Sequence, residues 1–213
     1  GGGRIAISYG EKTYDGRIQA LGGESHDGPG EAGSVYVVNS SGDLWVEGGH
    51  TLVDADDVFS SITLAENGTL VLAGAVTVSQ EVALPAHGTI HIADAHALDN
   101  LPLAREISGT LVVDTAFELP ASESNPDSDL TVYGTLVVNA PLTIAGDLLV
   151  PEHPGLLTHD RGITQSELWV GGTLAVGSDA RINLVGKGLS AGRSIDPITG
   201  EIINTHVDYS TTG

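Results

Sequence analysis

The side chains best suited to chemistry in this sequence are oxygen donors in two short polar stretches. Oxygen ligands at alternate positions of a loop are a common way in which proteins bind calcium. The candidate calcium ligands are Asn125, Asp127, Asp129, Asp54, Asp56 and Asp57. The first stretch lacks the glycine at its sixth position and the later bidentate glutamate of an EF-hand loop. Solvated acidic loops explain both stretches as well, so we expect no firmly bound cofactor, with calcium as the only candidate.

Neighbouring carboxylates in these stretches raise the alternative of polysaccharide chemistry. Glycosidases need two carboxylates a few ångströms apart on an exposed face, and Trp45 and Trp169 are the aromatic side chains that could stack on a sugar. Trp45, however, lies between the apolar residues Leu44 and Val46, and nothing in the sequence places it beside a carboxylate pair. We therefore predict no catalytic and no cofactor-binding residue. A polysaccharide-binding or polysaccharide-degrading β-helix, like a tailspike or a lyase, is the alternative function.

Histidine–aspartate neighbours occur at His26-Asp27 and His159-Asp160. Adjacent residues of a strand point to opposite faces, so neither pair is expected to act as a catalytic dyad. No predicted helix pairs two of the eight histidines at i, i+4, and no Gly-x-Ser-x-Gly elbow occurs. Zinc binding and Ser-His-Asp catalysis therefore have no support in the sequence.

The balance of charge excludes several classes of partner. The chain has 213 residues, with 28 Asp and Glu against eight Lys and Arg, and a net charge of −20. Nucleic acids need a positive surface, and a membrane span needs a long apolar run, so neither partner is expected. The absence of cysteine rules out disulfides and thiol chemistry. Hydrophobic residues make up 40% and aromatic residues only 4%, which indicates a core of Val, Leu, Ile and Ala.

One short phrase of sequence, Gly-x-(Leu/Ile)-x-(Val/Leu/Ile), recurs along the chain. The strands that it forms must position the candidate residues named above. The seven copies begin at Gly42, Gly68, Gly88, Gly109, Gly134, Gly146 and Gly172. Successive glycines are 26, 20, 21, 25, 12 and 26 residues apart. A period of about 20–26 residues with one short strand per copy is typical of a solenoid. We expect one inward column of apolar residues, made of Leu44, Leu70, Ile90, Leu111, Leu136 and Leu174.

The repeats predict an all-β fold, a right-handed parallel β-helix. We expect roughly nine or ten coils, because each coil takes about 22 residues. Short strands in such a coil pair in parallel, about 4.8 Å apart, with the coils before and after. The alternative is an antiparallel β-sandwich, which also has short, closely spaced strands. A sandwich should be rich in hairpin signals, yet Asn-Gly occurs once and Asp-Gly twice.

Three parts of the chain differ in their pattern. They are 1–50, glycine-rich opening coils; 51–185, regular coils; and 186–213, a polar tail that begins a further loop or module. Three stretches interrupt the strands and are predicted to be loops or, in the first case, a short helix: 94–105, 121–129 and 151–166. Because both ends of the sequence are abrupt, we expect the chain to be part of a larger polypeptide.

The glycine-rich opening carries a family resemblance. Residues 1–7 (GGGRIAI), 16–23 (GRIQALGG) and 30–37 (GEAGSVYV) resemble, in this order, the glycine-rich tandem β-helix modules of very large bacterial cell-surface and secreted, adhesin-like proteins. Gly186-Lys187-Gly188 is similar to the opening of such a module. The resemblance implies a β-helix architecture and an extracellular or cell-surface location, and it does not imply an activity.

The outward residue between the two core positions is uncharged in all seven repeats, although the chain is strongly acidic. Stacked coils would align these residues into an apolar strip, with Val71, Val112, Val137 and Leu149 as the candidate assembly surface. Such a strip either stabilises the sheet or makes a lateral contact. We expect as partners copies of the chain or neighbouring modules of the same polypeptide, with glycans as a further candidate. The predicted function is a structural or adhesive extracellular β-solenoid module without catalysis.

Overall fold

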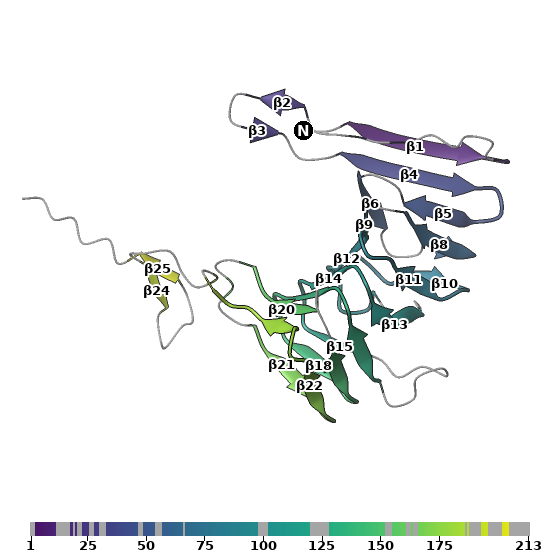
Figure 1. The fold of residues 1–213 in the computed structure, drawn as a ribbon. Helices are drawn as coiled ribbons and strands as arrows, with labels where there is room; N and C mark the ends of the chain where they lie inside the picture. Colours follow the sequence, from purple (N-terminus) through teal and green to yellow (C-terminus); the bar gives the residue numbers. More distant parts are fainter. Residues whose placement is uncertain are drawn as a thin grey trace, which may run out of the picture.

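The computed structural model describes residues 3–11, 18, 20, 23–25, 28–29, 33–46, 49–53, 57–65, 67–97, 102–119, 128–151, 155–160, 163, 166–185, 187, 193–195 and 202–204. All the regular secondary structure in these residues is β-strand. Most of the strands stack in parallel, turn upon turn, and form a β-solenoid of about five turns (Figure 1). The predicted all-β solenoid is confirmed, and the antiparallel sandwich is not formed.

The first face of the solenoid is its longest sheet. Its coil strands, neighbours in this order, are β6 (Gly49–Val53), β9 (Gly68–Leu72), β12 (Thr89–Ile92), β14 (Thr110–Val113), β17 (Thr135–Val138), β20 (Leu156–Thr158) and β23 (Arg181–Ile182). Every pairing between these strands is parallel. Each strand therefore repeats the side-chain positions of the strand one turn earlier.

Two shorter faces complete each turn. The second face consists of β11 (Val82–Leu84), β13 (Leu103–Ile107), β16 (Leu130–Val132), β19 (Leu148–Val150) and β22 (Leu174–Val176). The third face consists of β15 (Phe117–Leu119), β18 (Leu142–Ile144) and β21 (Leu168–Val170). In the earlier turns, β7 (Val58–Phe59) and β10 (Thr77–Val78) take the place of a third-face strand, and they pair with each other in parallel. The chain visits the three faces in a fixed order, as in the turn β17, β18, β19.

The predicted number of nine or ten coils is wrong, because it assigned about 22 residues of the whole chain to each coil, whereas the structure has about five turns. Nor does every copy of the repeated phrase begin a new coil. The copy at Gly146 leads into β19 on the second face, within the turn that the copy at Gly134 begins. The opening of the chain also adds sheet rather than coils. There β1 (Arg4–Tyr9) pairs in parallel with β4 (Ser34–Asn39), and β4 turns back on β5 (Asp43–Val46) as an antiparallel hairpin.

The remaining strands join this opening to the coils or form small hairpins. β5 continues in parallel to β8 (Ser61–Leu64), and β4 meets β6 where Ser34 pairs with His50. Besides β4 with β5, two described pairs are antiparallel: β2 (Glu24–Ser25) with β3 (Gly28–Pro29), and β24 (Arg193–Ile195) with β25 (Ile202–Asn204). The division of the chain at residues 50 and 185 stays a prediction.

The core inside the coils is one cluster of mainly aliphatic side chains, and a smaller cluster lies at the opening strands. Leu70, Ile90, Leu111 and Leu136 pair in register on the first face and are buried, as predicted. Leu44 is also buried, although it lies on β5. The prediction is wrong for Leu174, which is 46% exposed. It lies on β22 in the last turn of the second face, where no further described turn covers it.

Close approach of successive turns explains why the phrase begins with glycine. A Cβ atom on Gly134 would lie 2.6 Å from the carbonyl carbon of Ser108 and closer still to the carbonyl oxygens of Ser108 and Gly109. Real Cβ atoms do not approach backbone this closely. At this corner the Gly134 and Thr135 amides donate to the Ile107 and Gly109 carbonyls, at 2.9 and 2.8 Å. Glycine lets the turns come near enough to make these bonds.

Two of the three predicted loops contain a strand. Residues 103–107 form β13, although residues 94–105 were expected to leave the coil, and residues 156–158 form β20 within the expected loop 151–166. Of the third stretch, 121–129, only Ser128 and Asp129 lie among the described residues. The pattern does not predict β20 because its next inward position is His159, which breaks the apolar alternation.

Candidate functional site

The outer surface of the first face was the main candidate for a contact surface. Val71, His91, Val112 and Val137 pair in register on β9, β12, β14 and β17, so they form one outward ladder as predicted. The prediction is wrong for Leu149, which pairs with Thr131 and Ala175 on the second face. The ladder therefore has three of the four predicted assembly residues.

The ladder is not a bare apolar strip. Val112 is 5% and Val137 8% exposed, whereas Leu149 on the other face is 36% exposed. β-branched side chains in register at about 4.8 Å cover one another, and a second column of threonines at 69, 89, 110 and 135 runs beside them. A charged side chain at Val112 or Val137 would therefore lose much of its hydration. Participation of this face in assembly stays a prediction.

A polar stack lies next to the ladder, at the corner where the strands of the first face end. The amide nitrogen of Asn139 donates to Asp114 Oδ1 at 2.7 Å and to Asp160 Oδ2 at 2.8 Å. The backbone N–H of Asp160 donates to Asn139 Oδ1 at 2.8 Å, and His91 Nδ1 lies 3.1 Å from Asp114 Oδ2. Four successive turns thus contribute one side chain each to an exposed chain of polar contacts.

This stack brings two carboxylates together on the outside of the solenoid. Both bind the same nitrogen, so their accepting oxygens are no further apart than the sum of the two hydrogen bonds. Retaining glycosidases hold their two carboxyl groups about 5–5.5 Å apart, so a close pair of this kind has a precedent in sugar hydrolysis. The sequence did predict that His159 and Asp160 would point apart, and they do: His159 lines a hollow beside Leu157, and Asp160 contacts Asn139.

The stack could have been found in the sequence from one signal. Asp114, Asn139 and Asp160 each stand five residues after a glycine that begins a strand of the first face, namely Gly109, Gly134 and Gly155. Carboxylates that are close together in the sequence occur in the two short polar stretches instead, so a search for adjacent acidic residues would not find this stack.

Most of the calcium candidates lie outside the described residues, namely Asn125, Asp127, Asp54 and Asp56. Asp129 serves a corner of the second face, where its Oδ1 accepts the Asp147 N–H at 2.7 Å and Asp147 Oδ1 accepts the Thr173 N–H at 2.6 Å. Asp57 is half-buried near Tyr36, whose pKa is raised by burial and further by this carboxylate. In the part of the chain that the structure describes, no three His, Asp or Glu side chains converge as a metal site would require.

A further acidic side chain is fixed in the turn between β4 and β5. Asp43 accepts hydrogen bonds from Ser61 Oγ at 2.7 Å and from Asn39 Nδ2 at 2.8 Å. These two donors, Ser61 first, lower the pKa of the Asp43 carboxyl. Asn39 Oδ1 in turn accepts the backbone N–H of Asp43 at 2.8 Å. This network closes the turn and favours the ionised form of the Asp43 carboxyl.

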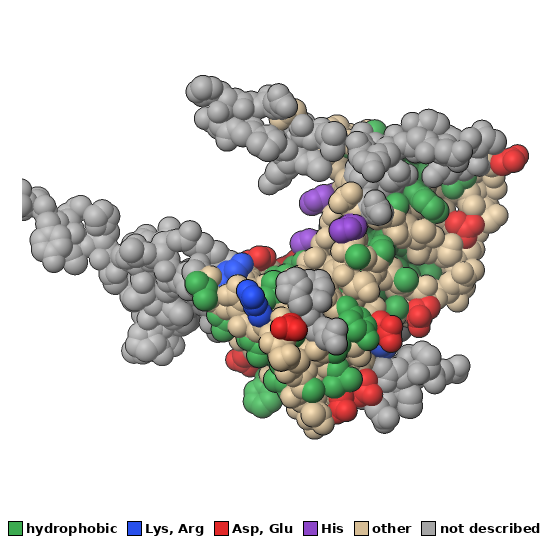
Figure 2. Space-filling model, viewed as in Figure 1, with side chains coloured by type: hydrophobic (Ala, Val, Ile, Leu, Met, Phe, Trp, Pro, Cys, Tyr) green, Lys and Arg blue, Asp and Glu red, His purple; other side chains and the backbone are tan. Residues whose placement is uncertain are grey.

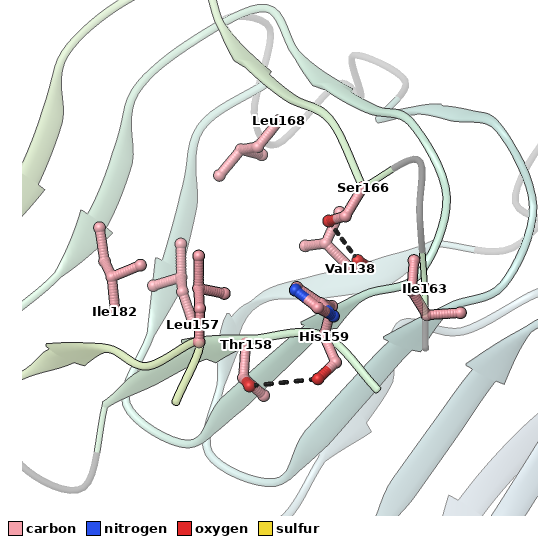
Figure 3. Close-up of a pocket in the computed structure, with 9 residues that line it drawn as sticks. Val138, Leu157, Thr158, His159, Ile163, Ser166, Leu168 and Ile182 are labelled. Carbon is pink, nitrogen blue, oxygen red and sulfur yellow. Dashed lines mark hydrogen bonds between the residues drawn. The ribbon is translucent and has the colours of Figure 1, made fainter. Parts of the chain in front are cut away.

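A hollow of about 310 Å³ opens at the last turn of the solenoid (Figure 3). Its walls are inward side chains of the final strands, among them Val138, Leu157, Leu168 and Ile182. His159 and Ser166 add polar atoms on one side, where Ser166 Oγ donates to the Val138 carbonyl at 2.5 Å. The hollow is the open end of the apolar core rather than a cleft across the coils.

The candidate sugar platforms lie on β5 and β21. Trp45 is half-buried and packs against the apolar cluster of Val35 and Val37. Trp169 is 64% exposed on β21, where its Nε1 donates to Glu167 at 3.3 Å. Neither indole lies on the strands β12, β14, β17 and β20 that lead to the stack.

Comparison with known proteins found no match. No family model matches the chain, and no curated protein or solved structure was found to be similar to it. Among the described residues, no helix is long and apolar enough to cross a membrane.

Proposed function

We propose that the chain is a structural or adhesive module of an extracellular or cell-surface fibre, built as a right-handed β-helix. The observation that carries the proposal is the continuous core, in which inward residues from Leu44 to Leu157 form a single buried cluster. Each turn of such a solenoid contacts only its neighbours, so turns add up to a rod with no need for a central site. The net charge of −20 keeps the rod soluble.

The resemblance of the glycine-rich opening to tandem bacterial surface modules supports the same proposal. Immunolabelling of intact source cells with antibodies against the 213-residue chain tests it. We expect labelling without permeabilisation, and release of the antigen when the cells are treated with an external protease. Labelling that requires permeabilisation would contradict an extracellular role.

The second candidate function, action on a polysaccharide, is favoured by the carboxylate pair of Asp114 and Asp160. The test is an assay for new reducing ends and unsaturated sugars, with the whole chain and with Asp114→Asn and Asp160→Asn. Our proposal predicts no product from a panel of neutral and acidic polysaccharides. Product formation that both variants abolish, and that Asp43→Asn retains, would replace the scaffold with an enzyme.

A further inference from the structure

A cleft opens on the outer surface of the first sheet, where two neighbouring strands separate. β4 and β6 pair only at Ser34 and His50. At Val37 β4 already pairs with β5 instead, while β6 continues beside β9. Figure 1 shows β4 running alongside β1 and β5, and β6 turning away toward β9. Both strands have neighbours on either side, so the cleft lies within the sheet and not at one of its ends.

A side chain holds the two strands together at the bottom of the cleft. The Thr51 hydroxyl of β6 donates to the Val35 carbonyl of β4, and these residues are 1% and 0% exposed. This bond joins the strands one residue after their main-chain pairing ends. In open α/β sheets, ligands bind in crevices where neighbouring strands separate, and the same local geometry occurs here.

Part of the cleft is apolar. Its volume is about 370 Å³, and its apolar lining includes Ala6, Leu52 and the ring of Tyr36. Ala6 and Tyr36 pair in register on β1 and β4, and Tyr36 packs against the buried Phe59 with 6.4 Å between the ring centroids. Leu52 is 44% exposed, so this apolar surface is open to a ligand.

Polar side chains of three kinds complete the lining. Arg4 supplies hydrogen-bond donors, Asp57 supplies acceptors, and the hydroxyl of Ser34 can do both. Arg4 and Ser34 pair in register beside Ala6 and Tyr36. Burial raises the pKa of Tyr36 and the Asp57 carboxylate raises it further, which agrees with a position of this carboxylate near the phenol. The formal charges of Arg4 and Asp57 cancel within the cleft.

The charge around the cleft favours a neutral ligand. The chain has a net charge of −20, and Asp and Glu side chains are spread along the coils in Figure 2. This field repels an acidic sugar or another polyanion. A neutral sugar ring has an apolar face of C–H groups and an edge of hydroxyls that both donate and accept. The cleft offers a surface for each, namely an aromatic and aliphatic part and a few polar groups.

We propose that this cleft binds a neutral sugar residue of a glycan. The sugar ring packs on Tyr36 and Leu52, and its hydroxyls form hydrogen bonds with Arg4 and Asp57. Small-molecule sites have volumes of about 300–1,000 Å³, and the cleft lies at the lower end of this range. It therefore takes a short segment of a glycan rather than a polymer that follows the coils. This inference rests on the adhesive role proposed above and names the class of ligand.

Saturation-transfer difference NMR of the 213-residue chain tests the site, with maltose, cellobiose, lactose and mannobiose as probes. We expect saturable binding of at least one of them, and weaker binding of the same sugar oxidised to its uronic acid. Asp57→Asn and Arg4→Gln should each weaken binding at least about tenfold, because each removes a charged hydrogen-bond partner. Asp160→Asn and Arg181→Gln, the same changes outside the cleft, should bind like the parent.

A third variant blocks the cleft without removing a polar contact. Leu52→Arg places a larger side chain at an exposed position of the lining and should abolish binding, whereas Leu149→Arg on the second face should not. Circular dichroism identifies any variant that fails to fold, and the other cleft variants then decide.

Two results would overturn the sugar site. One is the absence of saturable binding by all four probes, and the other is binding that Asp57→Asn, Arg4→Gln and Leu52→Arg leave unchanged. Binding that only Asp160→Asn removes would place the sugar on the polar stack and would equally contradict the cleft. Cell-surface labelling does not depend on these results, so the scaffold proposal would still stand.

Discussion

Replacing Gly134 by alanine tests the close packing of the turns directly. The new methyl group would lie 2.6 Å from the Ser108 carbonyl carbon, inside the van der Waals limit, and the atoms around it are backbone. The turns must move apart, which strains the hydrogen bonds from Gly134 and Thr135 to the preceding turn. Overpacking costs about 1–3 kcal/mol, and each weakened bond adds about 1 kcal/mol. Alanine also lowers the conformational entropy of the unfolded chain, which offsets less than about 1 kcal/mol of this loss in stability.

The net expectation is a loss of about 2–4 kcal/mol, which lowers the melting temperature by about 5–15 °C for a chain of this length. Thermal unfolding monitored by circular dichroism measures the shift. Gly10→Ala is the matched control, because no atom lies within 4 Å of the position of its Cβ. If the Gly134→Ala protein melts within about 1 °C of the control, the argument from turn spacing fails.

Burial and charge support four further predictions. Leu111→Asp places an unpaired carboxylate in the core and should unfold the chain or cost several kcal/mol, measured by urea titration. Val112→Lys with Val137→Lys should lower the melting temperature markedly, whereas Leu149→Lys should leave it nearly unchanged. Because the pKa of Asp43 is lowered in the fold, its contribution is present above about pH 4 and is lost as pH falls through the lowered value; Asp43→Asn should therefore reduce the acid sensitivity of the urea midpoint below pH 4. Calcium should raise the melting temperature only gradually, by relieving general repulsion, and a saturable rise below about 0.1 mM would instead indicate a dedicated site.

The sequence was sufficient for features that depend on neighbouring residues. The alternation in Leu70-Val71-Leu72 and its repeats determines which side chains face inward, and the glycine before each strand reflects a local steric limit. Both properties repeat within a few residues, so the pattern can be recognised without a structure. The inward column and the parallel solenoid were therefore predicted correctly on the first face.

Features that depend on register between turns could not be predicted in the same way. Asp114 and Asn139 are 25 residues apart, and Asn139 and Asp160 are 21 apart, so their contact exists only once the turns are aligned. The coil number failed because it assumed that the whole chain forms coils, whereas the opening strands β1 and β4 extend a sheet and β4 forms a hairpin with β5. Leu174 has the pattern of a core residue, and its exposure depends on whether another turn covers β22.

The geometry also constrains the kind of partner that this molecule can bind. Corresponding positions of successive turns on the first face lie side by side, about 4.8 Å apart, so a partner that follows the coils meets one position from each turn. A small ligand would meet several similar positions, whereas a repetitive partner meets all of them at once and gains from each. A polysaccharide along the Asp114, Asn139 and Asp160 stack would be a partner of this kind. Because the chain has a net charge of −20, a neutral polysaccharide should bind there better than an acidic one.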